Sequence, residues 1–193
     1  MAASAEAHHA LDLSQVKAAD IILTASGSAG SQGIRHTTCS PFSHAILVLE
    51  DGKAIEAIPD SGVGRSLLSD ALEKSTYAVQ YRHKGINEDY ALWVCHFAKA
   101  QEGKEYDYYG AVRSGASTGC SLTLYTAPGF LVRLTHDVTQ KRKHNNQFFC
   151  SELIASSFEK AGLPLLNIPS HAVTPGAIAA SDKLTLINDL ITA

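Results

Sequence analysis

The chain has 193 residues, of which 45% are hydrophobic and 18% charged, as is typical of a globular domain with a buried core. The formal net charge of −3 argues against the basic face that binds nucleic acid. No apolar run reaches the ~20 residues of a membrane span. The first residues also lack the basic and apolar regions of a conventional signal peptide, so we expect a cytoplasmic protein or one exported without such a signal.

Residues 1–17 are expected to form a partly disordered leader, followed by a single catalytic domain over residues 18–193. Residues 20–24 are β-branched and apolar, which predicts a strand entering the core. Residues 25–41 are rich in Ser and Gly and predict a long loop, a feature that often borders a functional site.

Two apolar runs on either side of Asp51-Gly52 predict a β-hairpin. A turn of three residues, ending at Gly52 with a positive φ, would pair Ile46 with Glu56. His44 and Glu56 would then share one face of the sheet, whereas a two-residue turn would place them on opposite faces.

The remaining elements follow from periodicity and from turn residues. In chain order we expect a strand near 64–66, a short helix over 67–74, a strand over 77–82, an amphipathic helix over 87–101, an aromatic turn over 103–110, an insertion of uncertain form at about 111–147, a helix from Cys150 to a stop at Gly162 and Pro164, an extended crossing over 165–174 and a terminal segment over 176–190.

Cys150 is the strongest candidate nucleophile, because it lies where the buried pair Phe148-Phe149 meets an apolar-periodic helix. The unpaired N–H groups and the helix dipole at a first helical turn stabilise an anion, which lowers the pKa of a thiol there. The alternative is that Cys150 is only a small buried hydrophobic residue.

His44 is the candidate base, because among nine histidines it alone stands in an otherwise apolar strand. Glu56 is the single acidic residue within the second arm of the hairpin and could orient the imidazole. The alternative is a buried polar pair that only stabilises the sheet.

A metal alternative is the set His36, Cys39 and His44, which offers mixed nitrogen and sulfur ligands but lacks a clear fourth ligand. No glycine-rich phosphate-binding motif occurs either. We therefore expect neither a metal nor a cofactor. The four cysteines include no closely spaced pair and give no argument for disulfides.

Several short motifs, taken in this order, resemble those of permuted papain-like amidases of the YaeF/YiiX type, which are related to NlpC-type cell-wall peptidases and to lecithin:retinol acyltransferase. The motifs are Asp20-Ile21-Ile22-Leu23-Thr24, Phe42-Ser43-His44-Ala45-Ile46, Ile55-Glu56-Ala57, Gly103-Lys104-Glu105-Tyr106-Asp107 and Phe149-Cys150-Ser151-Glu152-Leu153. Residues 174–176 resemble the start of a Thr-Pro stretch near the C-terminus of that family. In one departure, Ala19 stands where relatives usually have glycine.

The resemblance implies an α+β, circularly permuted papain-like fold, in which an antiparallel sheet or small barrel packs against helices and the nucleophile lies at a helix N-terminus. It implies that Cys150 is the nucleophile, His44 the base and Glu56 the residue that orients the base. It also implies that Tyr106 lies near the oxyanion site, where the backbone N–H of Cys150 would be a donor.

The function expected from these residues and from the resemblance is hydrolysis of an amide bond by a cysteine amidase or peptidase, as in a secreted bacterial toxin. By resemblance the substrate is a peptidoglycan stem peptide or a small isopeptide-like amide, and an immunity or regulatory protein is left open as a partner. One alternative is an acyltransferase or lipase whose apolar groove is built from the insertion. The other is a catalytically silent binding module. The apolar residues proposed for the groove are Leu122, Leu124, Tyr125, Phe130 and Leu131.

Overall fold

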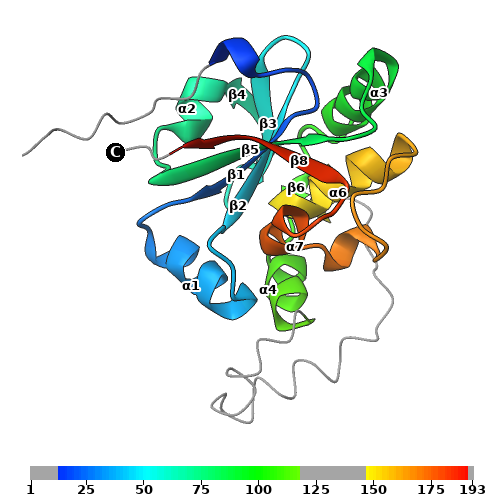
Figure 1. The fold of residues 1–193 in the computed structure, drawn as a ribbon. Coiled ribbons are helices and arrows are strands. Elements are labelled where there is room, and N and C mark those ends of the chain that lie inside the picture. Colours follow the sequence, from blue (N-terminus) through cyan, green and yellow to red (C-terminus); the bar gives the residue numbers. More distant parts are fainter. Residues whose placement is uncertain (1–12, 118–146, 191–193) are drawn as a thin grey trace, which may run out of the picture.

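A computed structural model describes residues 13–117 and 147–190 of the chain (Figure 1). Its strands are β1 (Ile21–Ala25), β2 (His44–Val48), β3 (Lys53–Ile58), β4 (Gly62–Leu67), β5 (Tyr77–His83), β6 (Glu105–Tyr106), β7 (Gln147–Phe148) and β8 (Leu184–Leu190). Its helices are η1 (Leu13–Gln15), α1 (Ala29–Thr38), α2 (Leu68–Leu72), α3 (Glu88–Lys99), α4 (Tyr108–Ser117), α6 (Cys150–Lys160), η3 (Ser170–Ala172) and α7 (Pro175–Ala179).

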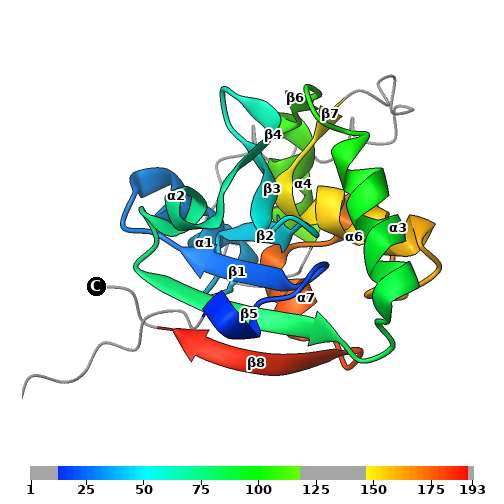
Figure 2. The same cartoon turned by 90° about the horizontal axis from the view of Figure 1, so that it is seen from above.

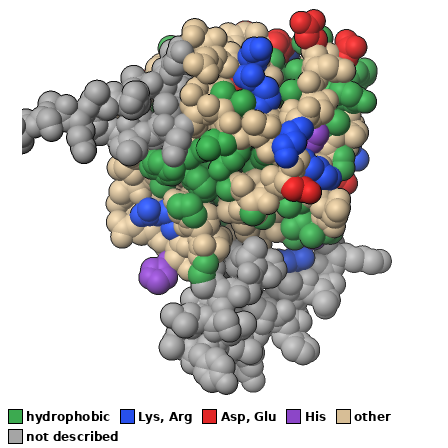
Figure 3. Space-filling model, viewed as in Figure 1, with side chains coloured by type: hydrophobic (Ala, Val, Ile, Leu, Met, Phe, Trp, Pro, Cys, Tyr) green, Lys and Arg blue, Asp and Glu red, His purple; other side chains and the backbone are tan. Residues whose placement is uncertain are grey.

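Six strands form one antiparallel sheet in the order β4-β3-β2-β1-β5-β8, so β4 and β8 are its edges. The short strands β6 and β7 pair separately and in parallel. The expected antiparallel sheet packed against helices is therefore confirmed. At the β8 edge Leu186 is exposed, and hydrophobic side chains gather on the β5–β8 side of the face drawn in Figure 3.

Helices cover both faces of the sheet (Figure 2). On one face α3 and α6 lie side by side, and their apolar residues pack with Leu23, Ala45 and Leu47 in the larger core cluster. On the other face α2 packs against Ile46 and Val48 in a smaller cluster. Strands β1, β2, β3 and β5 thus alternate between the two cores, as the two-residue period of a strand requires.

The β2–β3 hairpin has the register that the three-residue turn predicts. Leu47 pairs with Ile55 and Val48 with Ala54, and the Leu49 N–H donates to the Lys53 carbonyl oxygen at 2.8 Å. Gly52 ends the turn at φ +75°, a conformation that glycine adopts without a steric penalty. The expected pair of Ile46 with Glu56 would be the next step in this register, but the ladder ends at Leu47 with Ile55.

The long loop expected over residues 25–41 is wrong, because most of it is helix α1. The Ser28 hydroxyl caps this helix by accepting the Ser31 N–H at 3.2 Å, and Cys39 ends it in the left-handed conformation at φ +48°. The small residues between them weaken helix propensity, but the cap and the packing of α1 against α4 compensate.

The C-terminal part also differs from the expectation. The crossing expected over residues 165–174 contains the short helix η3 in place of a strand. The terminal segment contains α7, which Thr174 caps, and then β8, which pairs with β5 from Ala78 to His83 with a register shift between Gln80 and Tyr81. Sequence pattern did not assign β8, because its pairing partner lies more than 100 residues earlier in the chain.

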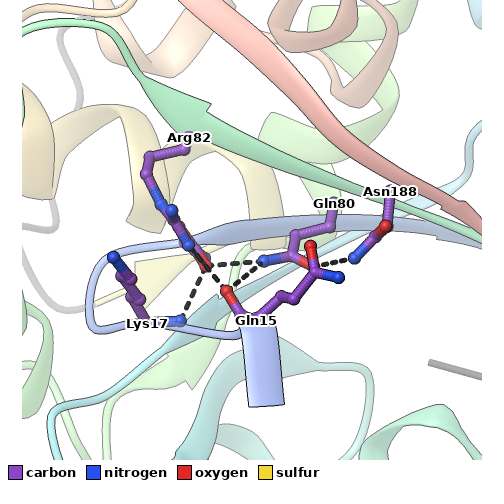
Figure 4. Close-up of polar contacts among 6 residues, drawn as sticks. Gln15, Lys17, Gln80, Arg82 and Asn188 are labelled. Carbon is purple, nitrogen blue, oxygen red and sulfur yellow. Dashed lines mark hydrogen bonds and ion pairs between the residues drawn. The ribbon is translucent and has the colours of Figure 1, made fainter. Parts of the chain in front are cut away.

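The start of β1 is held by a polar cluster around the fully buried carboxylate of Asp20 (Figure 4). Arg82 donates to both carboxylate oxygens at 2.7 Å, and Gln80 and the Lys17 N–H donate to one of them at 2.7 and 2.8 Å. Arg82 also donates to the Gln15 carbonyl oxygen at 2.8 Å. The turn that contains η1 is therefore joined to β1 and β5 through one carboxylate.

Candidate active site

Cys150 is the first residue of α6 and is 5% exposed. The preceding residue, Phe149, is buried and extended at φ −101° and ψ 166°, so the chain enters the helix directly from strand β7. The pairing of β7 with β6 sets the position of residues 147–148, and Cys150 follows two residues later as the first residue of α6. In this position the N–H groups of the first turn have no acceptor inside the helix.

The sulfur of Cys150 is surrounded by groups that favour its thiolate form. Burial raises the pKa of this thiol, but the charge of His44 and a side-chain hydrogen bond from it lower the pKa. The backbone N–H groups of Ala45 and Ser151 also donate to the sulfur. The net pKa of Cys150 lies below its ordinary value of 9.0.

The Ala45 N–H is available because β2 and β3 separate beyond Leu47. The last pair in their ladder is Leu47 with Ile55, although β3 continues to pair with β4 as far as Ile58. Backbone N–H groups along β2 point alternately to its two neighbouring strands, and the Ala45 N–H points towards β3. The Cys150 sulfur accepts this N–H in place of a carbonyl oxygen of β3. The N-terminus of α6 thus fills a gap in the sheet.

His44, at the start of β2, lies between Cys150 and Glu56. Its Nε2 is 2.5 Å from Glu56 Oε2, which leaves Nδ1 to face the sulfur. Glu56 is buried, and the His44 side chain is 24% exposed at the edge of the site. The contact agrees with the three-residue turn, which predicts that His44 and Glu56 share one face of the sheet.

The protonation states of the pair follow from this geometry. Burial lowers the pKa of His44, but the charge of Cys150 and the hydrogen bonds to Cys150 and Glu56 raise it to about 10. The raised pKa of His44 and the lowered pKa of Cys150 both favour an imidazolium beside a thiolate.

Tyr106, on β6, lies close to Cys150 and lines the same cleft. Its ring is buried and meets the ring of Tyr108 edge to face at 4.9 Å. Burial and the charge of Cys150 raise the pKa of the Tyr106 phenol above its ordinary range, so its hydroxyl stays protonated and can donate. Gly103, at φ +81°, forms the turn that leads the chain into β6.

A small cleft opens beside the sulfur between α1 and α4. Apart from the Cys150 sulfur, the described residues that line it are apolar or carry a hydroxyl, and none of them is Asp, Glu, Lys or Arg: Ile34, Thr38, Ser43, Tyr106, Ala111, Ser114, Phe149, Cys150, Ser151 and Pro175. The contribution of α1 was missed in the sequence, although Ser28 is a typical helix-capping residue and could have indicated it. The Ala45 N–H leaves no signal in the sequence, because every residue except proline has one.

The other two described cysteines differ from Cys150. Cys95 is fully buried in α3, and burial together with the charge of Glu50 raises the pKa of its thiol to about 11. Cys39 is disulfide-bonded, which differs from the expectation that nothing in the sequence argues for disulfides. Cys150 is therefore the only described cysteine whose thiol favours deprotonation.

His36, Cys39 and His44, the residues of the metal alternative, do not fit a zinc site. The disulfide removes Cys39 as a thiolate ligand, and His44 already contacts Glu56 and Cys150. Within residues 13–117 and 147–190, no three His, Cys, Asp or Glu side chains are placed to hold a metal ion. Among the helices in these ranges, none has the length and apolar character needed to cross a membrane. The apolar groove residues Leu122, Leu124, Tyr125, Phe130 and Leu131 lie outside the described part of the chain.

Comparison with known proteins finds similarity in sequence and in fold. No protein-family model matches the chain. In sequence it is similar to the probable lipoprotein peptidase YaeF of Escherichia coli K12, with 26% identity over 171 residues. The match covers 83% of this chain and 61% of YaeF, so the chain spans less than two thirds of that relative.

In fold the chain is similar to YiiX from Escherichia coli O157:H7, whose crystal structure is titled that of a metalloprotein. The TM-score is 0.63 with 19% identity, and the match covers 91% of this chain and 98% of YiiX. At this identity the likeness shows the fold alone. The resemblance to the YaeF/YiiX type that the motifs predict is confirmed, in sequence by YaeF and in fold by YiiX.

Proposed function

We propose that this protein is a cysteine hydrolase of amide bonds, with Cys150 as nucleophile, His44 as general base and acid, and Glu56 as the residue that orients His44. The observation that carries the proposal is the placement of the Cys150 sulfur at a helix N-terminus against an imidazole that Glu56 holds at 2.5 Å. The name of YaeF, a probable peptidase, supports the same class of reaction.

The reaction begins with attack of the Cys150 thiolate on the carbonyl carbon of the amide. The negative charge on the carbonyl oxygen would be stabilised by the Cys150 N–H and by the Tyr106 hydroxyl. His44, as imidazolium, then protonates the leaving amine as the C–N bond breaks, which leaves an acyl thioester on Cys150. His44 next removes a proton from water, and the resulting hydroxide attacks the thioester carbonyl carbon. The C–S bond then breaks, which releases the carboxylic acid and restores the Cys150 thiolate beside the His44 imidazolium.

The residues that carry this chemistry occur in the order histidine strand, then cysteine helix. This order supports a circularly permuted papain-like arrangement, as the resemblance implies. By the same resemblance the substrate is a peptidoglycan stem peptide or a small isopeptide-like amide, and the cleft without charged side chains is compatible with an uncharged peptide segment next to the cleaved bond.

The test is to incubate the wild-type protein and the Cys150→Ala variant with purified peptidoglycan fragments and to identify products by mass spectrometry. The wild type should release new amine termini, and Cys150→Ala should lower the rate by about a thousandfold or more. Cys95→Ala, which removes a buried thiol outside the site, is the matched control and should stay active.

Other outcomes would replace the proposal. Cleavage that persists in Cys150→Ala would contradict it. A stable mass gain of one acyl chain on Cys150 after incubation with a lipid ester, without cleavage of any peptide, would favour the acyltransferase instead. Absence of any product or acyl enzyme would favour the binding module.

A further inference from the structure

The segment of residues 173–176, which we call the clamp segment, contacts both chain segments that carry site residues. It precedes and begins α7, and Thr174 caps that helix by accepting the Ala177 N–H at 3.1 Å. Thr174 is 1% exposed, and Pro175 lines the cleft beside Cys150. The clamp segment has no role in the hydrolytic reaction proposed above, although its residues 174–176 form one of the motifs noted in the sequence.

On one side the clamp segment is bonded to the first turn of α6. The Ser151 hydroxyl, fully buried, donates to the Val173 carbonyl oxygen at 2.8 Å. Ser151 directly follows Cys150, and its own N–H donates to the Cys150 sulfur. The position of the sulfur is therefore tied to the clamp segment through a single residue.

On the other side Gly176 packs against Ser40, in the loop that leads to His44. A Cβ at position 176 would lie 2.7 Å from both Cβ and Oγ of Ser40, closer than two such atoms approach. Ser40 cannot easily turn away, because its Oγ accepts the Phe42 N–H at 3.0 Å. Phe42 is itself buried, and its ring stacks on Tyr77 at 5.8 Å.

We propose that Gly176 is a positioning residue: its missing side chain lets the clamp segment hold the loop before His44 against the helix that begins at Cys150. This inference rests on the proposed hydrolase function, because it concerns the same sulfur and imidazole. Any side chain at position 176 should push the Ser40 loop outwards and separate His44 from Cys150. Misplacement of about 1 Å is enough to lower a rate by roughly a hundredfold.

The test is a double-mutant cycle with Gly176→Ala and Ser40→Gly. The measurement is the rate at which iodoacetamide alkylates Cys150, mapped by peptide mass analysis over a range of pH. Gly176→Ala should slow alkylation at pH 7 by about tenfold or more and move the acid limb of the profile to higher pH, because the thiolate loses His44. In the Ser40→Gly background, the same change should alter the rate by less than about twofold.

Gly30→Ala is the matched control, since Gly30 also lies in a helix but an added Cβ there would meet nothing within 4 Å. Its alkylation rate should stay near that of the wild type. If Gly176→Ala is folded and reacts like Gly30→Ala, or if it slows alkylation equally in the Ser40→Gly background, the inference is overturned.

A second variant keeps the inference testable if Gly176→Ala does not fold. Ser151→Ala removes the other contact of the clamp segment with a smaller change of shape, and it should slow alkylation by more than about threefold with the same shift of the acid limb. A wild-type profile in Ser151→Ala would then overturn the inference. His44→Ala separates the two proposals. If His44→Ala leaves alkylation unchanged, the hydrolase function fails, whereas if it slows alkylation and the clamp variants do not, only the positioning role fails.

Discussion

Cys150 and His44 change each other's proton affinity, and Glu56 acts on Cys150 only through His44. The carboxylate of Glu56 is one of the groups that raise the pKa of His44 to about 10. The charge of His44 in turn lowers the pKa of Cys150 against the opposing effect of burial. Because His44 remains protonated at neutral pH, the reactivity of Cys150 should begin at a pH well below the ordinary thiol value of 9.0.

Replacement of Glu56 by glutamine tests this coupling. Glu56→Gln removes a negative charge from His44, so the pKa of His44 should fall and less imidazolium should be present at pH 7. The thiolate then loses part of its counter-charge, and the pKa of Cys150 should rise. We expect the acid limb of the alkylation profile to move to higher pH and the rate of amide cleavage to fall by about tenfold or more.

Glu102→Gln is the matched control, because Glu102 pairs with Arg65 on the surface, outside the site. It should leave both measurements within about twofold of the wild type. An unchanged profile in Glu56→Gln would show that Glu56 has no influence on the proton shared by His44 and Cys150.

At the scale of the element, Ala19 leads the chain into β1 at a position where the family resemblance implies glycine. Ala19 has φ +63°, in the left-handed region that favours glycine, and it is buried in the larger core cluster. Its N–H donates to the Val48 carbonyl oxygen at 2.9 Å, so the backbone there cannot relax without losing a bond to β2. Compared with the glycine that the family resemblance implies at this position, alanine adds a buried methyl group but accepts strain.

Two substitutions at this position should therefore have unequal effects. Ala19→Val should lower the free energy of unfolding by about 2 kcal/mol or more, because a β-branched residue is strongly disfavoured at positive φ. Ala19→Gly should change it by less than about 1 kcal/mol, since relief of strain offsets the lost methyl group. Urea unfolding measures both, and a larger loss for Ala19→Gly than for Ala19→Val would contradict this account.

Across the whole molecule, Asp20 links distant parts of the chain. Its carboxylate joins the turn at residues 13–17 to β1 and to β5. Gln80 extends the cluster to the edge strand β8 by accepting a hydrogen bond from Asn188 at 3.3 Å. Four segments separated in sequence thus depend on one buried anion.

Asp20→Asn should accordingly destabilise the whole fold. The amide removes the charge that balances Arg82 and directs an N–H towards other donors, which should lower the free energy of unfolding by about 3 kcal/mol. The surface pair gives the comparison: Arg65→Ala should lower it by less than about 1 kcal/mol. Denaturant unfolding measures both free energies, and equal losses in the two variants would argue against a central role for Asp20.

Local signals predicted much of this molecule. The Asp51-Gly52 turn and the alternating runs beside it predicted the hairpin and the face shared by His44 and Glu56. The aromatic pair before Cys150 predicted the start of α6. These features are decided by neighbours within a few residues, and a turn type or a helical period leaves its mark on composition.

Only the tertiary structure decided the rest. It shows that the β2–β3 ladder ends at Leu47, so that the Ala45 N–H can donate to the Cys150 sulfur. It also shows that β8 completes the sheet beside β5 and that Gly176 packs against Ser40. Each of these is a contact between segments far apart in sequence, made by a backbone N–H, a strand edge or a missing side chain. Such groups carry no distinctive residue type, so their role depends on which partner the folded chain brings to them.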